Sequence, residues 1–190
     1  MKKITKNCGR PLDNDFGFKY YSESQFLQLA GGLKSNIDFS VFHINIRSLN
    51  ANQSKLIQLL SVLEYDFDVI ILSELWSYNI EFYNNILIGY SLYTDLAVGT
   101  QIGGIGIFVK NCFDAKILTH FNIQSSDNNK LENLWLEVRR RGRKFIVGGC
   151  YRHPNQSISE FNNALDKTLS LIAADKTPIF AGDLSIDLLK

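Results

Sequence analysis

Apart from Asp68, residues 67–72 are apolar and three of them are β-branched, and this stretch constrains the fold of the chain more than any other. Such a run, without a polar face, is typical of a central strand that is covered on both sides. Glu74 lies two residues after it. In α/β proteins, ligands and metal ions bind where central strands end, because the covering layers part there. The run therefore predicts a buried strand with a functional carboxylate at its exit.

A second strand exit of the same kind occurs near the other end of the sequence. Residues 178–183 form a short apolar run that stops on Gly182 and Asp183. We expect Glu74 and Asp183 to belong to one acidic site, brought together by parallel or neighbouring strands.

The composition is that of an ordinary globular domain. With 190 residues and 45% hydrophobic content, the chain can bury a sizeable core. A net charge of +1 gives no global argument for or against nucleic acid. Three widely spaced cysteines, no secretion signal and no membrane-length apolar run indicate an intracellular, non-secreted protein without a membrane partner.

The pattern of periodicity divides the chain into an extension, residues 1–37, and a domain, residues 38–190. The extension has a polar lead-in of about twenty residues and a short helix over residues 22–33. The domain opens with a strand at 39–46 and an amphipathic helix at 51–63. Together with the strand at 67–72 they predict a β-α-β unit with two parallel strands.

Strands follow one another in the middle of the domain and predict a meander, with the turn into its last strand at residues 141–143. A helix at 157–173 then leads into the strand that ends at Asp183, and a polar loop is expected at 125–130. The predicted strands are residues 86–94, 102–110, 115–121, 131–139 and 144–151.

Polar side chains gather at the strand exits and suggest phosphodiester chemistry. Mg²⁺ prefers oxygen ligands and needs only one or two carboxylates besides a substrate phosphate. Glu74 and Asp183 fit that role. Tyrosine, arginine and asparagine side chains at the other exits would donate to phosphate oxygens.

Six short motifs, in this order, resemble the endonuclease/exonuclease/phosphatase superfamily, and more narrowly the apurinic-type endonuclease domain of non-LTR, jockey-like retrotransposon polyproteins. They are Asn-Ile-Arg-Ser-Leu at 45–49, Ser-Glu-Leu-Trp at 73–76, Gly-Gly-Ile-Gly-Ile-Phe-Val at 103–109, Leu-Trp-Leu-Glu at 134–137, Tyr-Arg-His-Pro at 151–154 and Gly-Asp-Leu-Ser-Ile-Asp-Leu-Leu at 182–189. The resemblance covers residues 38–190.

The resemblance implies a four-layer α/β sandwich and nicking of one DNA strand that depends on Mg²⁺ or Mn²⁺. It implies that Asn45 orients the acidic groups, Glu74 binds the metal, Tyr151 contacts the scissile phosphate and Asp183 positions or activates water. Arg152 would lie near the phosphate backbone. The family further implies DNA as partner, a reverse transcriptase domain downstream and a nuclear location.

Two departures from the family pattern bear on activity. Ser185 stands where the family has an asparagine two residues after the aspartate, which keeps a donor but shortens its reach. No residue matches the histidine of the family's final Ser-Asp-His motif. We therefore expect a truncated domain that does not cleave DNA alone and that leaves one sheet edge exposed.

Other interpretations of these residues stay open. The chain can also be a non-catalytic DNA-binding remnant or another phosphoesterase of the same fold, acting on phosphomonoesters or lipids. His153 can face substrate or solvent, and His43 and His120 are expected to be structural. The basic run 139–144 can grip DNA or simply be solvated at a hairpin tip.

Overall fold

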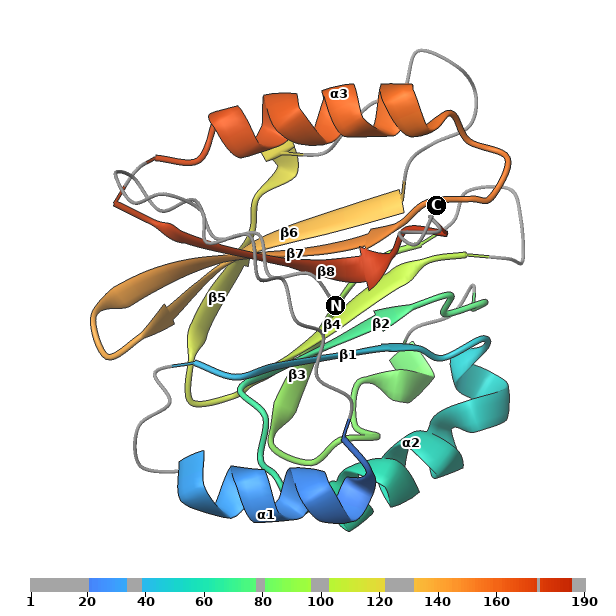
Figure 1. Cartoon of the computed structure of the whole chain (residues 1–190), viewed down its shortest axis with the longest axis vertical. Helices are drawn as coiled ribbons and strands as arrows, with labels where there is room; N and C mark the ends of the chain where they lie inside the picture. Colours follow the sequence, from blue (N-terminus) through green and yellow to red (C-terminus); the bar gives the residue numbers. More distant parts are fainter. Residues whose placement is uncertain are drawn as a thin grey trace.

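Two four-stranded sheets packed face to face, with helices on both outer sides, make up the part of the protein that the structure describes (Figure 1). The computed structural model describes residues 21–33, 39–77, 81–96, 103–121, 132–173 and 175–185. The expected lead-in over residues 1–20 and the expected loop at 125–130 lie outside these ranges. Within them, no helix has the length and apolar character needed to cross a membrane.

The first sheet has the strand order β1-β2-β4-β3, and the second has the order β5-β6-β7-β8. Helices α1 and α2 cover the first sheet, and α3 covers the second, which gives the expected four layers (Figure 1). The elements of the first half are α1 (Glu23–Leu33), β1 (Val41–Asn45), α2 (Leu49–Leu63), β2 (Val69–Ser73), η1 (Glu81–Tyr83), β3 (Tyr90–Asp95) and β4 (Ile105–Lys110). Those of the second half are β5 (Asp114–Ile117), η2 (Thr119–Phe121), β6 (Glu132–Arg140), β7 (Arg143–Tyr151), α3 (Ile158–Ser170) and β8 (Thr177–Asp183).

Strand β2 is central, as its sequence predicts, and all five of its residues are buried. It pairs parallel with β1 and antiparallel with β4. Val69 and Ile71 pack into the core between the two sheets, whereas Ile70 and Leu72 pack into the core under α2. Because both faces of β2 meet apolar layers, its run lacks the polar alternation of a half-exposed strand.

The second sheet combines an antiparallel meander, β5-β6-β7, with the parallel strand β8. The turn between β6 and β7 is formed by Arg141 (φ 47°) and Gly142 (φ 77°), a pair of left-handed residues that suits a two-residue hairpin. Phe161 and Leu165 of α3 pack against Trp135 and Ile146 on the outer face of this sheet.

Three expectations differ from the structure. The stretch expected as a strand at 86–94 forms turns until β3 begins at Tyr90, and Ile88 there is almost fully exposed. The strand expected at 115–121 ends at Ile117, because η2 turns the chain and buries Phe121 against Trp135. Glu74 and Asp183 come together across the sandwich and not within one sheet, because β2 and β8 belong to different sheets.

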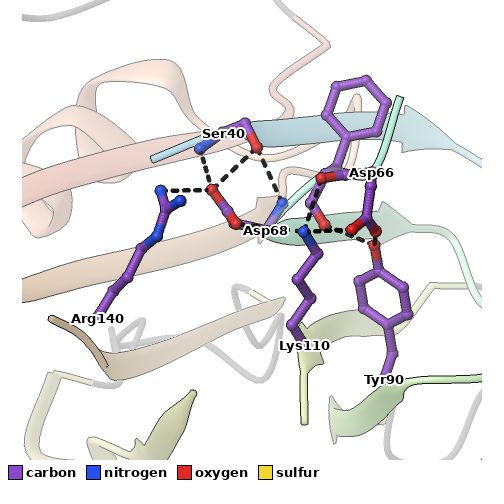
Figure 2. Close-up of polar contacts among 7 residues, drawn as sticks. Ser40, Asp66, Asp68, Tyr90, Lys110 and Arg140 are labelled. Atoms are coloured by element: carbon purple, nitrogen blue, oxygen red, sulfur yellow. Dashed lines mark hydrogen bonds and ion pairs between the residues drawn. The ribbon is translucent and has the colours of Figure 1, made fainter. Parts of the chain in front are cut away.

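A buried carboxylate, Asp68, ties the two sheets together at the end of the sandwich where β2 begins (Figure 2). One of its oxygens accepts hydrogen bonds from the Ser40 backbone N–H (2.8 Å) and from Arg140 Nη1 (3.0 Å), and Arg140 belongs to the second sheet. Lys110 Nζ lies 3.5 Å from the other oxygen and 2.8 Å from the Asp66 carboxylate. Burial and Asp66 raise the pKa of Tyr90, which donates to Asp66 (3.0 Å). These bonds fix the end of the sandwich opposite Glu74.

Candidate active site

Asn45, Glu74 and Asp183 meet where the last residue of β1, the exit of β2 and the last residue of β8 come together. The side-chain amide of Asn45 donates to Glu74 Oε1 at 2.6 Å and to Asp183 Oδ2 at 2.6 Å. The two carboxylate oxygens therefore lie no farther apart than twice that distance. The side-chain oxygen of Asn45, Oδ1, accepts a hydrogen bond from the Arg47 backbone N–H (3.1 Å), and this bond turns the side-chain NH₂ group toward the two acids.

An unusual backbone turn aims Glu74 at Asn45. Glu74 (φ 59°) and Trp76 (φ 48°) both adopt the left-handed conformation, which costs a residue with a side chain about 1–3 kcal/mol. The N–H groups of residues 75 and 76 donate to the carbonyls of Gly104 (3.2 Å) and Gly103 (2.9 Å). On the other side, the N–H groups of residues 48 and 49 donate to the carbonyls of residues 74 and 75 (2.9 and 2.8 Å). Bonds on both sides hold this turn.

Ser185 holds the carboxylate of Asp183 through hydrogen bonds. Its backbone N–H donates to Asp183 Oδ1 at 3.0 Å, and its hydroxyl lies 3.4 Å from the same oxygen. Ser185 itself is left-handed, with φ 46°. Both carboxylate oxygens of Asp183 thus accept hydrogen bonds from the chain, one from Asn45 and one from Ser185.

Tyr151 ends β7 beside the two acids and stays protonated. Its register partners are Glu132 on β6 and Asp183 on β8. Burial, followed by the charges of Glu74, Asp183 and Glu132, raises the pKa of Tyr151 to about 12, although Arg47 opposes the rise. The phenol is therefore a hydrogen-bond donor at neutral pH.

Arg152 is buried, and its guanidinium group binds backbone carbonyls. Nε donates to Leu184 O at 2.6 Å, and Nη2 donates to Ser185 O at 2.5 Å. Nη1 donates to the carbonyls of His153 (3.1 Å) and Gln156. The structure thus places Arg152 between the loop after β7 and the loop after β8, where it orders both, rather than on the surface where a DNA backbone would lie.

Glu132, which belongs to none of the six motifs, is buried next to these residues. Its Oε2 accepts the Gly104 N–H at 2.5 Å, and its Oε1 lies 3.4 Å from His153 Nε2. Burial raises the pKa of Glu132, and His153 and the Gly104 N–H oppose that rise. The turn at residues 141–142 carried a signal for it, because a two-residue hairpin turn there sets Glu132 opposite Tyr151.

His153 is only about a third exposed, and its ring packs edge-on against Tyr151 with the centroids 4.7 Å apart. His43 lies deeper, with Nε2 3.1 Å from the Ser73 hydroxyl. Burial lowers the pKa of His43 to about 4, against the opposing charge of Asp183, so this imidazole is neutral.

The donor set suits a hard divalent cation such as Mg²⁺ or Mn²⁺. Within the described ranges, no three His, Cys, Asp or Glu side chains are grouped to hold a metal ion by themselves. Mg²⁺, however, commonly takes one or two carboxylates and fills its other positions with water and substrate phosphate. Glu74 would supply a carboxylate ligand to such a cation, and Asp183 lies beside it, bonded to the same amide.

Solved structures share this architecture, although no protein-family model and no curated protein matches the sequence. The endonuclease domain of TRAS1, a telomere-specific non-LTR retrotransposon, superposes with a TM-score of 0.59 at 15% identity, over 79% of this chain and 62% of that one. TDP2 from D. rerio, complexed with a single-strand DNA product, gives 0.61 at 18% identity, over 78% and 61%. An AP endonuclease from Archaeoglobus fulgidus gives 0.53 at 16% identity, over 77% and 57%.

The chain thus spans about three fifths of the length of these matched chains. At such low identity the likeness concerns the fold. The paired sheets, their helical covers and these neighbours together identify it: the chain has the endonuclease/exonuclease/phosphatase fold.

Proposed function

We propose that this chain belongs to a DNA endonuclease domain of a non-LTR retrotransposon, and that the activity of this domain, hydrolysis of phosphodiester bonds to nick a target strand, depends on Mg²⁺ or Mn²⁺. The observation that supports this most is the bridge from Asn45 to Glu74 and Asp183, with two bonds of 2.6 Å. Two of the neighbours named above are endonucleases by name and the third is complexed with a single-strand DNA product, which favours DNA as the substrate class.

In this proposal each side chain has a role that follows from its chemistry. Glu74 is the residue that would hold the cation, which when bound would neutralise negative charge on the phosphate. Tyr151, protonated, donates to a phosphate oxygen. Asp183 accepts a proton from the attacking water, while Asn45 and Ser185 keep its carboxylate in place.

We expect the 190-residue chain to bind DNA and metal without turning over. The family resemblance calls for a histidine in a Ser-Asp-His motif, and none of the three histidines in this sequence stands in one. Partners in the same polyprotein would include a reverse transcriptase domain. Because the target would be chromosomal DNA, we propose a nuclear location.

Fluorescence anisotropy with a labelled oligodeoxynucleotide, with Mg²⁺ and with a chelator, tests the function. We expect the wild-type chain to bind the oligodeoxynucleotide more tightly in Mg²⁺ than in chelator, and the Glu74→Gln variant to lose this Mg²⁺-dependent gain in affinity. Glu137→Gln is the matched control, because Glu137 of β6 is also a buried carboxylate but pairs with Arg139 and Lys176. Equal Mg²⁺ increments in all three proteins would overturn the metal-dependent function.

A plasmid assay separates the remaining alternatives. Binding without nicked circles supports the non-catalytic behaviour expected of the isolated chain. Nicked circles that vanish in Glu74→Gln would contradict that expectation while supporting the endonuclease chemistry. Hydrolysis of phosphomonoesters or lipid phosphodiesters, with no affinity for DNA, would instead favour another phosphoesterase of this fold.

A further inference from the structure

The buried carboxylate of Glu132 contacts two different segments, Gly104 before β4 and His153 after β7. Glu132 begins β6, is only 4% exposed and lies in the second sheet. Its Oε2 accepts the N–H of Gly104, which belongs to the segment leading into β4 of the first sheet. Its Oε1 faces His153 of the loop after β7. The two oxygens of one side chain therefore touch both halves of the sandwich.

The first contact leads to Glu74. Gly103 and Gly104, held by Glu132, accept the backbone N–H bonds of residues 76 and 75 (2.9 and 3.2 Å). Gly103 lies directly against the carboxylate, since a Cβ built on it would be 2.2 Å from Glu132 Oε1, and its φ of 111° also favours glycine. Glu132 is therefore linked, through Gly103 and Gly104, to the left-handed turn that aims Glu74.

The second contact leads to Tyr151. His153 packs its ring edge-on against the Tyr151 ring, and Tyr151 lies between Glu132 and Asp183 in the sheet register. The contacts form a closed circuit, because Asp183 is joined through Asn45 to Glu74. Glu132 itself makes no hydrogen bond described above to Asn45, Glu74 or Asp183, so it can act on them only through its neighbours.

We propose that Glu132 is a positioning residue of the active site: by its length it holds the Gly103–Gly104 segment and His153 at once, and so sets the separation of Glu74 and Tyr151. This inference rests on the proposed function, in which Glu74 holds the cation. Groups that orient ligands from behind a metal site typically change its affinity about 10-fold to 100-fold when they are altered.

Two substitutions separate the length of the Glu132 side chain from its charge. Glu132→Gln keeps the length and an oxygen that can accept the Gly104 N–H, but removes the charge. Glu132→Asp keeps the charge but is one methylene shorter, so it cannot reach Gly104 and His153 together. Positioning predicts that Gln preserves the site and Asp disrupts it, whereas simple attraction of the cation by a nearby charge predicts the reverse.

Mn²⁺ binding measured by calorimetry on the full chain, at a temperature where urea titration shows each variant to be folded, is the test. We expect Glu132→Asp to weaken Mn²⁺ binding about 10-fold or more, and Glu132→Gln to stay near the wild-type affinity. Glu137→Asp and Glu137→Gln are the matched controls on the same strand, and both should bind like the wild type.

The outcomes distinguish the two proposals. If the wild-type chain binds no Mn²⁺, the proposed function fails and the role of Glu132 fails with it. Two results with a wild type that binds Mn²⁺ would overturn only the positioning role. One is a Glu132→Asp variant that binds Mn²⁺ as tightly as the wild type, and the other is a Glu132→Gln variant that binds it about 10-fold more weakly. Should Glu132→Asp not fold, Glu132→Gln decides alone, since a tenfold loss there would contradict positioning.

Discussion

One amide group of Asn45 bonds to two acidic side chains. Removing it should therefore lower the free energy of unfolding, by an amount that depends on whether metal is present. In Asn45→Ala, Glu74 and Asp183 lose the donor they share. Hydrogen bonds to charged groups are worth about 1.5–3 kcal/mol, and we expect a loss of that order in the free energy of unfolding in chelator. Excess Mg²⁺ should restore more stability to this variant than to the wild type, because a cation can replace the missing donors.

Urea titrations in chelator and in Mg²⁺ measure both effects. Asn52→Ala is the control, because the Asn52 amide donates to the carbonyls of Ile46 and Arg47 beside the site without touching the acids. It should be destabilised with no extra recovery in Mg²⁺. The same recovery in both variants would show that the cation does not bind between Glu74 and Asp183.

Tyr151 should make the protein less stable in alkali. Its pKa is about 12 in the folded state, against an ordinary value near 10, so the unfolded chain releases this proton first as the pH rises. The contribution of Tyr151 to the free energy of unfolding is fully present below pH 10 and is lost as the pH rises toward 12. Between pH 9 and 11 the wild type should lose about 1 kcal/mol more than Tyr151→Phe in urea titrations. Equal losses would mean that Tyr151 titrates normally in the folded protein.

At the scale of elements, the hairpin between β6 and β7 joins the two sheets through one of its arginines. Arg140 binds buried Asp68 at 3.0 Å and lies over the Phe113 ring, 5.5 Å from its centroid. Removing it in Arg140→Ala leaves a buried carboxylate short of a partner, and we expect a loss of about 2–3 kcal/mol. Arg141→Ala, at the exposed tip, should stay within about 0.5 kcal/mol of the wild type. Chemical denaturation measures both, and equal effects would exclude an inter-sheet role for Arg140.

The elements and their local order could be predicted from the sequence, but the contacts between sheets could not. The buried run of β2, the parallel pairing with β1 and the hairpin turn follow from periodicity and turn residues. The bridge from Asn45 to Asp183 joins residues 138 positions apart on strands of different sheets, and no local pattern encodes it. The burial of Arg152 is not encoded locally either, because two of its partners are carbonyls of a loop about 30 residues away.

For the whole molecule, the site and the basic hairpin lie at opposite ends of the same strands. Tyr151 ends β7 and Arg143 begins it, and at about 3.3 Å per residue the strand is roughly 25 Å long. Of the hairpin's charges, Arg139 pairs with Glu137, and Arg140 pairs with Asp68. Arg47, in contrast, is exposed next to Asn45. DNA bound at the acidic site should therefore meet Arg47 and not the hairpin.

The salt dependence of DNA binding can test this arrangement, because each phosphate contact contributes about one unit to the slope of log Kd against log salt. Arg47→Ser should weaken binding of an oligodeoxynucleotide and reduce that slope by about one. The double variant Arg141→Ser with Lys144→Ser removes two positive charges from the hairpin, yet should leave both affinity and slope unchanged. A slope that falls in the hairpin variant and not in Arg47→Ser would place the DNA at the other end of the sandwich, away from Glu74 and Asp183.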